Sequence, residues 1–375
     1  MIPFNRPYFS GRELEHVKEA MLSGHVSGDG RFSRRCEAFF EERYGLRRSL
    51  LTTSCTDALE MAALLCEIAP GDEVILPSFT FVSTANAFAL RGARLRFVDS
   101  LPDSPNMDTA LVEGLITPRT RVLVAVHYAG VACDMDPLLA LAAEHGLRVV
   151  EDAAQGVEAT YKGRPLGALG DLGTFSFHET KNIHCGEGGL LAVNRDELRG
   201  RAEILREKGT NRSAFFRGET DKYGWVDLGS SFLPSDLLAA VLWGQIEELE
   251  SIQTRRMGLW ERYSSGLAEL AAKDEVRLPS IPDFAGHNAH LFYLVVDSLA
   301  RRTALIAHLK QAGCMAVFHY QSLHQSAYFK GQHDGRPLPH ADEYSDCLLR
   351  LPLYIKLTES EQNGIIEAVL GFYRG

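Results

Sequence analysis

This sequence of 375 residues lacks any apolar run long enough to span a membrane, which takes about 20 consecutive apolar residues in a helix. Its first residues also lack the apolar core of a secretion signal, because charged side chains follow at Arg12, Glu13 and Glu15. We therefore expect a soluble protein of the cytoplasm that is not embedded in a membrane.

An excess of positive charge is also absent. The chain has 39 Lys and Arg residues against 49 Asp and Glu residues, a formal net charge of −10 at pH 7, and no dense cluster of basic side chains. Nucleic acids and anionic membranes attract a concentrated positive surface, so neither is an expected partner. The expected ligands are small molecules, and any anionic group among them must be held by local dipoles and a few placed side chains.

Cysteine is sparse, and no two cysteines have the CxxC spacing of a zinc or redox motif. The number of cysteines is odd, which argues against a disulfide framework. The seven are Cys36, Cys55, Cys66, Cys133, Cys185, Cys314 and Cys347. We expect free thiols in a reducing compartment and no metal site.

What remains is an ordinary globular composition, with 45% hydrophobic and 23% charged residues. In the first two thirds of the chain, short apolar segments typical of strands alternate with helical patterns. Strands are expected over 49–53, 73–76, 95–98, 121–126, 148–151, 174–177 and 189–193, and helices over 56–67, 82–90, 111–116, 137–145 and 196–208. This alternation predicts an α/β fold whose sheet is covered by helices on both faces.

A long helix is expected over 235–270, because leucine and isoleucine residues recur there at helical spacing after a proline. A smaller α+β portion follows, with strands over 291–296 and 316–319 and helices over 301–312 and 359–373. We therefore predict a large domain over 1–245 and a small C-terminal domain over 246–375, with the long helix bridging them.

Two junctions at strand ends carry residues suited to charged groups. Ser54, Cys55 and Thr56 begin a helix, where free N–H groups and the helix dipole favour an anion such as phosphate. Ordinary N-capping explains this segment by itself at least as well. Asp152 ends a buried strand, at the edge where open α/β sheets bind ligands. A carboxylate there needs a positive partner, although a simple N-cap role would also account for it.

Two further junctions offer an amine and an aromatic face. Lys181 follows the strand that includes Ser176, and glycines at 186, 188 and 189 come next. A lysine enclosed between strands loses hydration, which lowers its pKa and makes the amine a nucleophile; the alternative is a surface lysine near a turn. Phe81 follows another strand end and could stack on a flat ring, unless Phe79 and Phe81 are both core residues.

Together the four junctions match the needs of one cofactor, pyridoxal 5′-phosphate (PLP). A pyridine aldehyde of this kind needs a lysine to bond covalently, a carboxylate beside its ring nitrogen, an anion cup and a stacking aromatic ring. The sequence predicts Lys181 and Asp152 for the first two roles. The cup is predicted at 54–56 with Ser176, and the stacking ring at Phe81.

The motifs 151–155 (EDAAQ), 175–178 (FSFH), 181–182 (KN) and 186–189 (GEGG) together resemble those of the DegT/DnrJ/StrS sugar-nucleotide aminotransferases. The resemblance covers nearly the whole chain and implies fold-type I, the aspartate-aminotransferase-like architecture, with a mixed, mostly parallel sheet. It implies PLP, with Lys181 and Asp152 as the catalytic pair. It also places Gln155 near the ring hydroxyl, Ser176 and Thr56 on the phosphate, and active sites at the interface of a homodimer.

Two positions depart from that group's pattern. The group often has Gly-x-Asn-x-Arg before the long helix, and its asparagine reaches the partner's phosphate, but this chain has Gly-Ser-Ser-Phe-Leu at 229–233. Ser231 is the candidate to replace that contact. Cys55 stands where glycine is common, so its main-chain N–H is the group expected to serve the cup.

Within the group, the segments 127–133, 177–182 and 207–212 resemble the branch that makes dTDP-4-amino-4,6-dideoxygalactose, a sugar of enterobacterial common antigen and lipopolysaccharide pathways. This implies transfer of the amino group of L-glutamate to dTDP-4-keto-6-deoxy-D-glucose. Amination at C3, formation of the gluco epimer at C4 and PLP-dependent dehydration are the alternatives. The candidate substrate contacts are Lys208, Arg212, His319, Tyr320 and His324.

Three other classes fit less well. A dehydratase of this fold carries histidine in place of Lys181. A nicotinamide oxidoreductase needs three glycines after a strand, and the nearest match, 28–33 (GDGRFS), lacks the third. A non-catalytic regulator would need a DNA-binding module, for which the chain has neither a spare segment nor a basic one.

Overall fold

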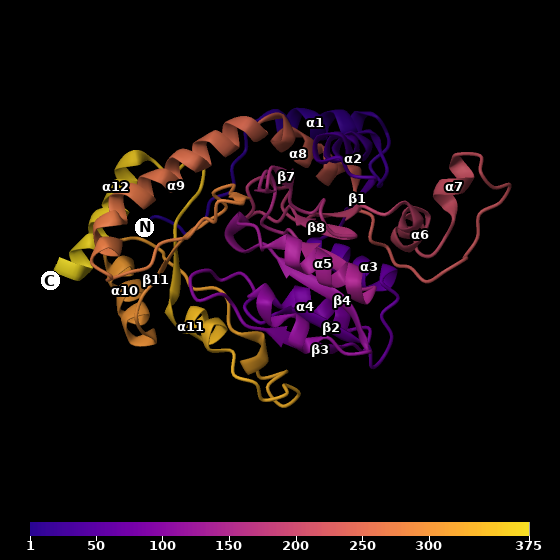
Figure 1. Cartoon of the computed structure of the whole chain (residues 1–375). Coiled ribbons are helices and arrows are strands. Elements are labelled where there is room, and N and C mark those ends of the chain that lie inside the picture. Colours follow the sequence, from indigo (N-terminus) through magenta and orange to yellow (C-terminus); the bar gives the residue numbers. More distant parts are fainter. Residues whose placement is uncertain (375) are drawn as a thin grey trace.

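A seven-stranded sheet forms the centre of the computed structural model, which describes residues 1–374 (Figure 1). In spatial order its strands are β1 (Arg48–Thr52), β9 (Gly189–Val193), β8 (Leu172–Ser176), β5 (Arg148–Asp152), β4 (Thr120–Val126), β2 (Glu73–Pro77) and β3 (Arg94–Val98). The run from β3 to β8 is parallel, and β9 is antiparallel to both of its neighbours. The predicted α/β fold with a mixed, mostly parallel sheet is confirmed.

Each face of this sheet carries its own hydrophobic layer because successive side chains of a strand point to opposite faces. In β2, Val74 and Leu76 belong to one buried cluster, whereas Ile75 belongs to the other. Helices α3 (Cys55–Leu65), α4 (Val82–Ala89) and α6 (Asp196–Arg206) supply the first cluster, and α2 (Arg31–Tyr44), α5 (Met135–His145) and α8 (Asp236–Glu247) the second. Both faces are therefore covered by helices, as the alternation predicts.

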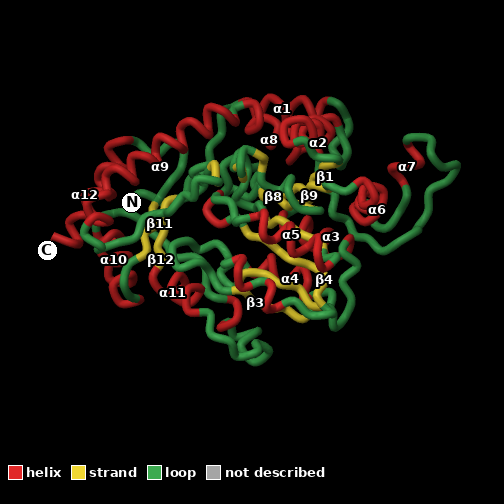
Figure 2. The backbone as a smooth tube through the Cα atoms, in the orientation of Figure 1, coloured by secondary structure: helices red, strands yellow, loops and turns green. Residues whose placement is uncertain are grey.

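The C-terminal portion lies to one side of the sheet. It is built on an antiparallel pair, β11 (Phe292–Val295) and β12 (Leu348–Leu351), with helices α9 (Leu249–Ala272), α10 (Leu299–Gln311), α11 (Pro339–Cys347) and α12 (Glu359–Arg374). Figure 2 shows this pair apart from the large sheet, on the side of the C-terminus, and α9 running between the two regions. The domain boundary between residues 245 and 246 stays a prediction.

The remaining elements are short or peripheral. They are α1 (Arg12–Leu22), α7 (Arg212–Phe216), a small sheet of β10 (Ala285–Gly286), β6 (Thr160–Tyr161) and β7 (Arg164–Pro165), and 3-10 turns at Thr109–Leu111, Glu113–Leu115, Tyr128–Gly130 and Leu323–Gln325. In Figure 1, α7 and the loop after it extend away from the body of the chain. No helix within residues 1–374 has the length and apolarity to cross a membrane.

Three expected elements differ from the structure. The helix expected over 235–270 is broken at Glu248, where φ is −102° and ψ is 6°, because α8 packs on α1 and α2 while α9 packs on α12. The segment 111–116 forms 3-10 turns, since Gly114 weakens the helix there. Residues 316–319 form no strand: Val317 makes a single bridge to Arg350, and the chain then turns away.

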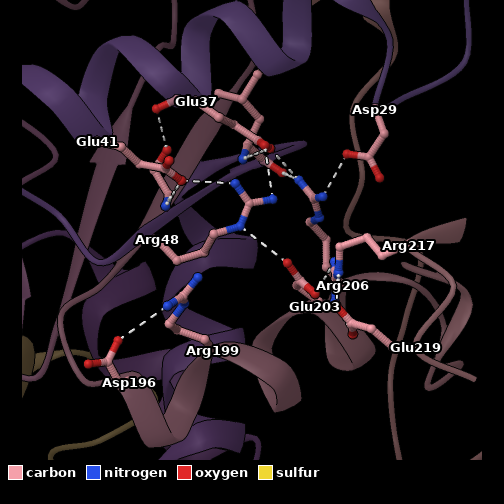
Figure 3. Close-up of polar contacts among 12 residues, drawn as sticks. Asp29, Glu37, Glu41, Arg48, Asp196, Arg199, Glu203, Arg206, Arg217 and Glu219 are labelled. Carbon is pink, nitrogen blue, oxygen red and sulfur yellow. Dashed lines mark hydrogen bonds and ion pairs between the residues drawn. The ribbon is translucent and has the colours of Figure 1, made fainter. Parts of the chain in front are cut away.

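A buried ionic cluster ties α6 to α2 and β1 (Figure 3). Arg206, at the end of α6, is 1% exposed and donates hydrogen bonds to Glu37 Oε1 and Asp29 Oδ1, each at 2.6 Å. Glu37 also accepts from the main chain of Leu51, and Arg48 lies 3.3 Å from its carboxylate. Because removing one member leaves a buried charge unmatched, this cluster holds the end of α6 in place.

We expect Arg206→Met to lower the free energy of unfolding by about 3–5 kcal/mol, the usual effect of breaking a buried ion pair. Arg199→Met is the matched control on the same helix, because Arg199 pairs with Asp196 3.3 Å away at the surface and such pairs contribute under about 1 kcal/mol. Urea unfolding of both variants measures the difference. Equal losses in the two variants would contradict a special contribution from the buried cluster.

Candidate active site

The carboxyl ends of β4, β5 and β8 open into a cavity of about 440 Å³. Residues far apart in sequence line it, from Phe4 near the N-terminus to Arg350 on β12. The predicted site residues found there are Ser54, Cys55, Thr56, Phe81, Asp152, Gln155, Ser176, Lys181, His319 and Tyr320. The tertiary fold thus brings together the four junctions that the sequence analysis singled out.

Lys181 lies in the turn that follows β8, with its side chain partly buried among the cavity walls. The turn is fixed by Asn182, whose amide donates to the carbonyl of Asn288 and whose oxygen lies 2.9 Å from Nδ1 of His290. The pKa of Lys181 is lowered from 10.5 to about 8, chiefly by desolvation; Arg350 acts in the same direction, and Cys55 and Asp152 act in the opposite one. A large fraction of this amine is therefore neutral at mildly basic pH, as nucleophilic and proton-transfer chemistry requires.

This shift makes a stability prediction for the protein without bound ligand. The pKa of Lys181 is about 8 folded and 10.5 unfolded, so the unfolded chain binds more protons between those values and stability rises with pH across that window. We expect Lys181→Met to be more stable than the parent below pH 8, by on the order of 1–3 kcal/mol, with the difference shrinking toward pH 10.5. Urea unfolding at several pH values tests this, and a constant difference would contradict it.

Asp152 is the last residue of β5 and is 6% exposed. Its Oδ2 accepts a hydrogen bond from the Thr84 hydroxyl at 2.7 Å, and its Oδ1 accepts from the Ala154 main chain at 3.2 Å. Thr80 lies 2.9 Å from the Thr84 hydroxyl and extends the chain of buried hydroxyl groups. Both direct partners are neutral donors, so they orient the carboxylate and leave its charge for a cation in the cavity. Sequence reasoning missed Thr84.

The start of α3 forms the predicted anion cup. Ser54 is the N-cap and its Oγ accepts from the Asp57 main chain at 3.1 Å, so the ordinary capping interpretation is correct for this side chain. The N–H groups of Cys55 and Thr56 have no acceptor inside the helix, and the helix dipole adds to their attraction for an anion. Gly189 of β9 packs so closely that an added Cβ would overlap the main chain at Ser54 and Cys55.

The side chains around the cup are polar but uncharged. Ser176 is 6% exposed and lines the cavity at the end of β8, and Thr56 Oγ1 lies 2.8 Å from Ser83 Oγ. Burial raises the pKa of the Cys55 thiol well above its ordinary value, and Asp152 adds to the effect. Cys55 therefore offers its N–H and not a thiolate.

The two phenylalanines after β2 have different roles. Phe79 is 1% exposed and belongs to the core, whereas Phe81 is 53% exposed and lines the cavity. The Phe81 ring centre lies 5.9 Å from that of Tyr320. An exposed aromatic ring beside the cavity fits stacking on a flat ligand and does not fit the alternative that both are core residues.

Gln155 joins the large sheet to the C-terminal portion. Its Nε2 donates to the Tyr320 hydroxyl at 3.0 Å, and its Oε1 accepts from the Ala129 main chain at 2.6 Å. Burial raises the pKa of Tyr320 to about 12, so this hydroxyl stays protonated. These contacts fix the amide and hold one wall of the cavity.

Arg350 is a second residue that sequence reasoning missed. It is 7% exposed, lines the cavity and donates from Nη1 to Nδ1 of His319 at 2.8 Å. Burial lowers the pKa of His319 to about 4, with help from Arg350 and Lys181, so the imidazole is neutral and accepts this bond. The available signal was a single arginine inside the apolar run at 348–353 (LLRLPL).

Four predicted site residues lie elsewhere. His324 is 3% exposed and bonds to Ser78 Oγ at 2.7 Å outside the cavity, a structural position that does not support its expected sugar contact. Lys208, Arg212 and Ser231 line a second cavity of about 720 Å³ between α2, α6 and α7. Ser231 is exposed and pairs with Glu207 through a single bridge. Within one chain, these residues do not join the first site.

No group of three His, Cys, Asp or Glu side chains suited to a metal ion occurs in the part of the chain that the structure describes, residues 1–374.

The sequence of the chain matches one known protein family. A profile of the DegT/DnrJ/EryC1/StrS aminotransferase family matches residues 7–370. The spore coat polysaccharide biosynthesis protein SpsC of Bacillus subtilis (strain 168) is 33% identical over 383 residues, which cover 100% of this chain and 97% of SpsC.

Two solved structures extend the likeness to the fold. The aminotransferase TlmJ from Streptoalloteichus hindustanus has a TM-score of 0.91 and 31% identity, covering 100% of this chain and 99% of TlmJ. The PLP form of a putative sugar aminotransferase from Streptococcus pneumoniae has a TM-score of 0.91 and 26% identity, covering 100% of this chain and 98% of that one.

Proposed function

The chain belongs to the DegT/DnrJ/EryC1/StrS aminotransferase family, whose members are PLP-dependent sugar aminotransferases, and we propose that it aminates a dTDP-linked keto sugar. The proposed reaction converts dTDP-4-keto-6-deoxy-D-glucose and L-glutamate to dTDP-4-amino-4,6-dideoxy-D-galactose and 2-oxoglutarate. The sugar and the C4 position rest on the resemblance of segments 127–133, 177–182 and 207–212. One observation supports PLP-dependent transamination most directly: an amine with a lowered pKa, a buried carboxylate and a helix N-terminus share one cavity.

The residues of this cavity fit PLP. Main-chain N–H groups at Cys55 and Thr56, with the hydroxyls of Thr56 and Ser176, are assigned to the phosphate. Phe81 is assigned to one face of the ring, and Gln155 to its hydroxyl. Asp152 is assigned to the ring nitrogen, for which its carboxylate is held by Thr84 and Ala154.

When bound, PLP supplies a pyridine ring that accepts the electron pair released from the α-carbon of the amino donor. Asp152 keeps the ring nitrogen protonated, because a fixed negative charge favours the cation beside it. Lys181 is the residue that would hold the cofactor covalently, because its amine is the nucleophile in this cavity. When not bonded to the cofactor, its Nζ would serve as the base that accepts the proton from the α-carbon of the amino donor, since a lowered pKa leaves the amine neutral at mildly basic pH.

The sugar nucleotide is proposed to enter beside His319 and Tyr320. Lys208 and Arg212 remain candidates for the diphosphate, in a homodimer that brings the second cavity of one chain toward the first cavity of another. Two aromatic side chains of α7 and the loop after it are exposed, Phe216 at 68% and Trp225 at 82%, and this exposure supports such a partner. Ser231 is proposed to reach the partner's phosphate in that arrangement.

A two-part experiment tests the proposed function. The purified holoenzyme is mixed with L-glutamate, and the visible absorbance of bound PLP is expected to disappear and to return with 2-oxoglutarate. The enzyme is then incubated with glutamate and candidate dTDP-keto sugars, and the product is identified by NMR. Detection of a C3 amine, the gluco epimer or a dehydrated sugar would show that the proposed product is wrong. Unchanged absorbance after addition of glutamate would refute transamination.

A further inference from the structure

His290 presents an unpartnered ring nitrogen to the cavity that holds Lys181. It is 5% exposed and lines this cavity. Its Nδ1 lies 2.9 Å from Oδ1 of Asn182, the residue after Lys181. Its other ring nitrogen, Nε2, has no hydrogen-bond partner within residues 1–374 and is not sealed from the cavity by protein atoms. Because polar atoms inside proteins are nearly always hydrogen-bonded, this nitrogen indicates a ligand.

The contacts of Asn182 determine which nitrogen of His290 carries the proton. The Asn182 amide nitrogen donates to the main-chain carbonyl of Asn288 at 2.9 Å, so the Asn182 oxygen is the acceptor that faces His290. Nδ1 of His290 therefore donates, and Nε2 of the neutral ring carries a lone pair. Burial lowers the pKa of His290 well below its ordinary range, and the charges of Lys181 and Arg256 lower it further. His290 thus offers the cavity a neutral hydrogen-bond acceptor.

Of the two proposed substrates, the keto sugar is the one that brings a suitable donor. Around its reacting carbon, glutamate carries a carboxylate, which only accepts hydrogen bonds when ionised, and an apolar methylene group. Its amino group is the group that is transferred. In the proposed sugar, the reacting C4 is flanked by C3, which carries a hydroxyl, and by C5, which carries a methyl group. The C3 hydroxyl is therefore the donor nearest to the reacting carbon.

We propose that Nε2 of His290 accepts a hydrogen bond from the C3 hydroxyl of the keto sugar and so selects sugars with a hydroxyl beside the reacting carbonyl; this assignment rests on the proposed function. Asn182 holds the imidazole from the same turn that carries Lys181, so the acceptor has a fixed position relative to the reacting amine. Such a site discriminates against a substrate that lacks the donor, because the buried acceptor is then left unpaired.

Two substitutions separate the two nitrogens of His290. Asparagine can replace Nδ1 as the donor to Asn182 but has no atom in the place of Nε2, whereas glutamine carries its amide oxygen there. In His290→Asn, the aminated holoenzyme is expected to react with dTDP-4-keto-6-deoxy-D-glucose about tenfold more slowly, the usual effect of one lost hydrogen bond. Its reaction with L-glutamate is expected to change less than about threefold, and His290→Gln is expected to recover most of the sugar rate. Stopped-flow absorbance measures both half-reactions.

An analogue of the sugar without the C3 hydroxyl provides a second readout. The parent enzyme is expected to react with it about tenfold more slowly than with the complete sugar, whereas His290→Asn is expected to react with both at equal rates. Calorimetry measures binding apart from chemistry: His290→Asn is expected to bind dTDP-D-glucose, which has no keto group, more weakly than the parent does, and dTDP equally well.

His287→Asn is the matched control. His287 belongs to the same segment, its Nδ1 accepts from the Ala289 main chain at 3.2 Å, and it does not line the cavity. Both half-reactions and the preference for the complete sugar are expected to stay at the parent level in this variant.

Each other outcome overturns the assignment. Equal slowing of both half-reactions in His290→Asn would assign Nε2 to Lys181, and a loss with glutamate alone would assign it to the incoming amino group. A changed absorbance of bound PLP would assign it to the cofactor, and an unchanged preference for the C3 hydroxyl would refute the contact. If His290→Asn fails to fold or to bind PLP, His290→Gln decides: it is expected to keep the preference for the complete sugar, and loss of that preference refutes the proposal.

The same measurements separate this proposal from the proposed function. A parent enzyme that reacts with glutamate but with no dTDP-keto sugar would refute the proposed function and the His290 contact together. A parent enzyme that aminates C4 of the complete sugar and of its analogue at equal rates would refute the His290 contact alone.

Discussion

Lys181→Ala is expected to lower the turnover number by roughly four orders of magnitude or more, because it removes both the covalent attachment of PLP and the proton carrier. The cofactor should still bind through the main-chain N–H groups of Cys55 and Thr56 and the ring of Phe81. The lower turnover number would then reflect the missing catalytic amine and not unfolding of the protein. Steady-state assays with glutamate and the keto sugar measure the rate. Mass spectrometry after borohydride reduction measures the covalent link, which is expected to be absent.

Lys162→Ala is the matched control, since Lys162 is a surface lysine that pairs with Asp136 at 2.6 Å. It is expected to leave turnover unchanged. A small added amine, such as methylamine, is expected to restore part of the activity of Lys181→Ala because it can carry the same proton. Near-parent turnover in Lys181→Ala would rule out the assigned role of this residue.

The second large effect is expected for Asp152→Asn, with a rate about a thousandfold below that of the parent. The amide keeps the volume of the carboxylate and can still accept from Thr84, but it lacks the negative charge that keeps the ring nitrogen of PLP protonated. The variant should bind PLP with altered visible absorbance. Stopped-flow measurement of the glutamate half-reaction determines the loss.

Thr84 provides a graded comparison for Asp152. Removing its hydroxyl in Thr84→Val breaks the 2.7 Å bond to Oδ2 but keeps the charge, so the loss should be much smaller than in Asp152→Asn, and Thr84→Ser should recover most of it. If Asp152→Asn retained the parent rate, the carboxylate would not be the partner of the ring nitrogen.

The placement of the cofactor residues could be predicted because each lies at the end of a strand or in the turn that follows it. Asp152 ends β5 and Lys181 follows β8; these strands are neighbours in the parallel part of the sheet, and parallel strands bring their carboxyl ends to one edge. The alternation of short apolar segments with helical patterns is a local feature of the sequence, so the sheet and its two helical layers could be predicted as well. The break at Glu248 could not, because α8 and α9 are each apolar at helical spacing and only their different packing partners require it.

By itself, then, the order of residues determined the α/β class and the strand-end motifs, since both depend on neighbours close in the chain. Only the tertiary structure decided that Arg350 and Thr84 enter the site, that His324 lies outside it, and that Lys208, Arg212 and Ser231 face a second cavity. These positions depend on packing between segments far apart in sequence, such as the 31 residues that separate Arg350 from His319 and the 68 that separate Thr84 from Asp152. Such contacts form only when separate elements are brought together by burial of their apolar faces.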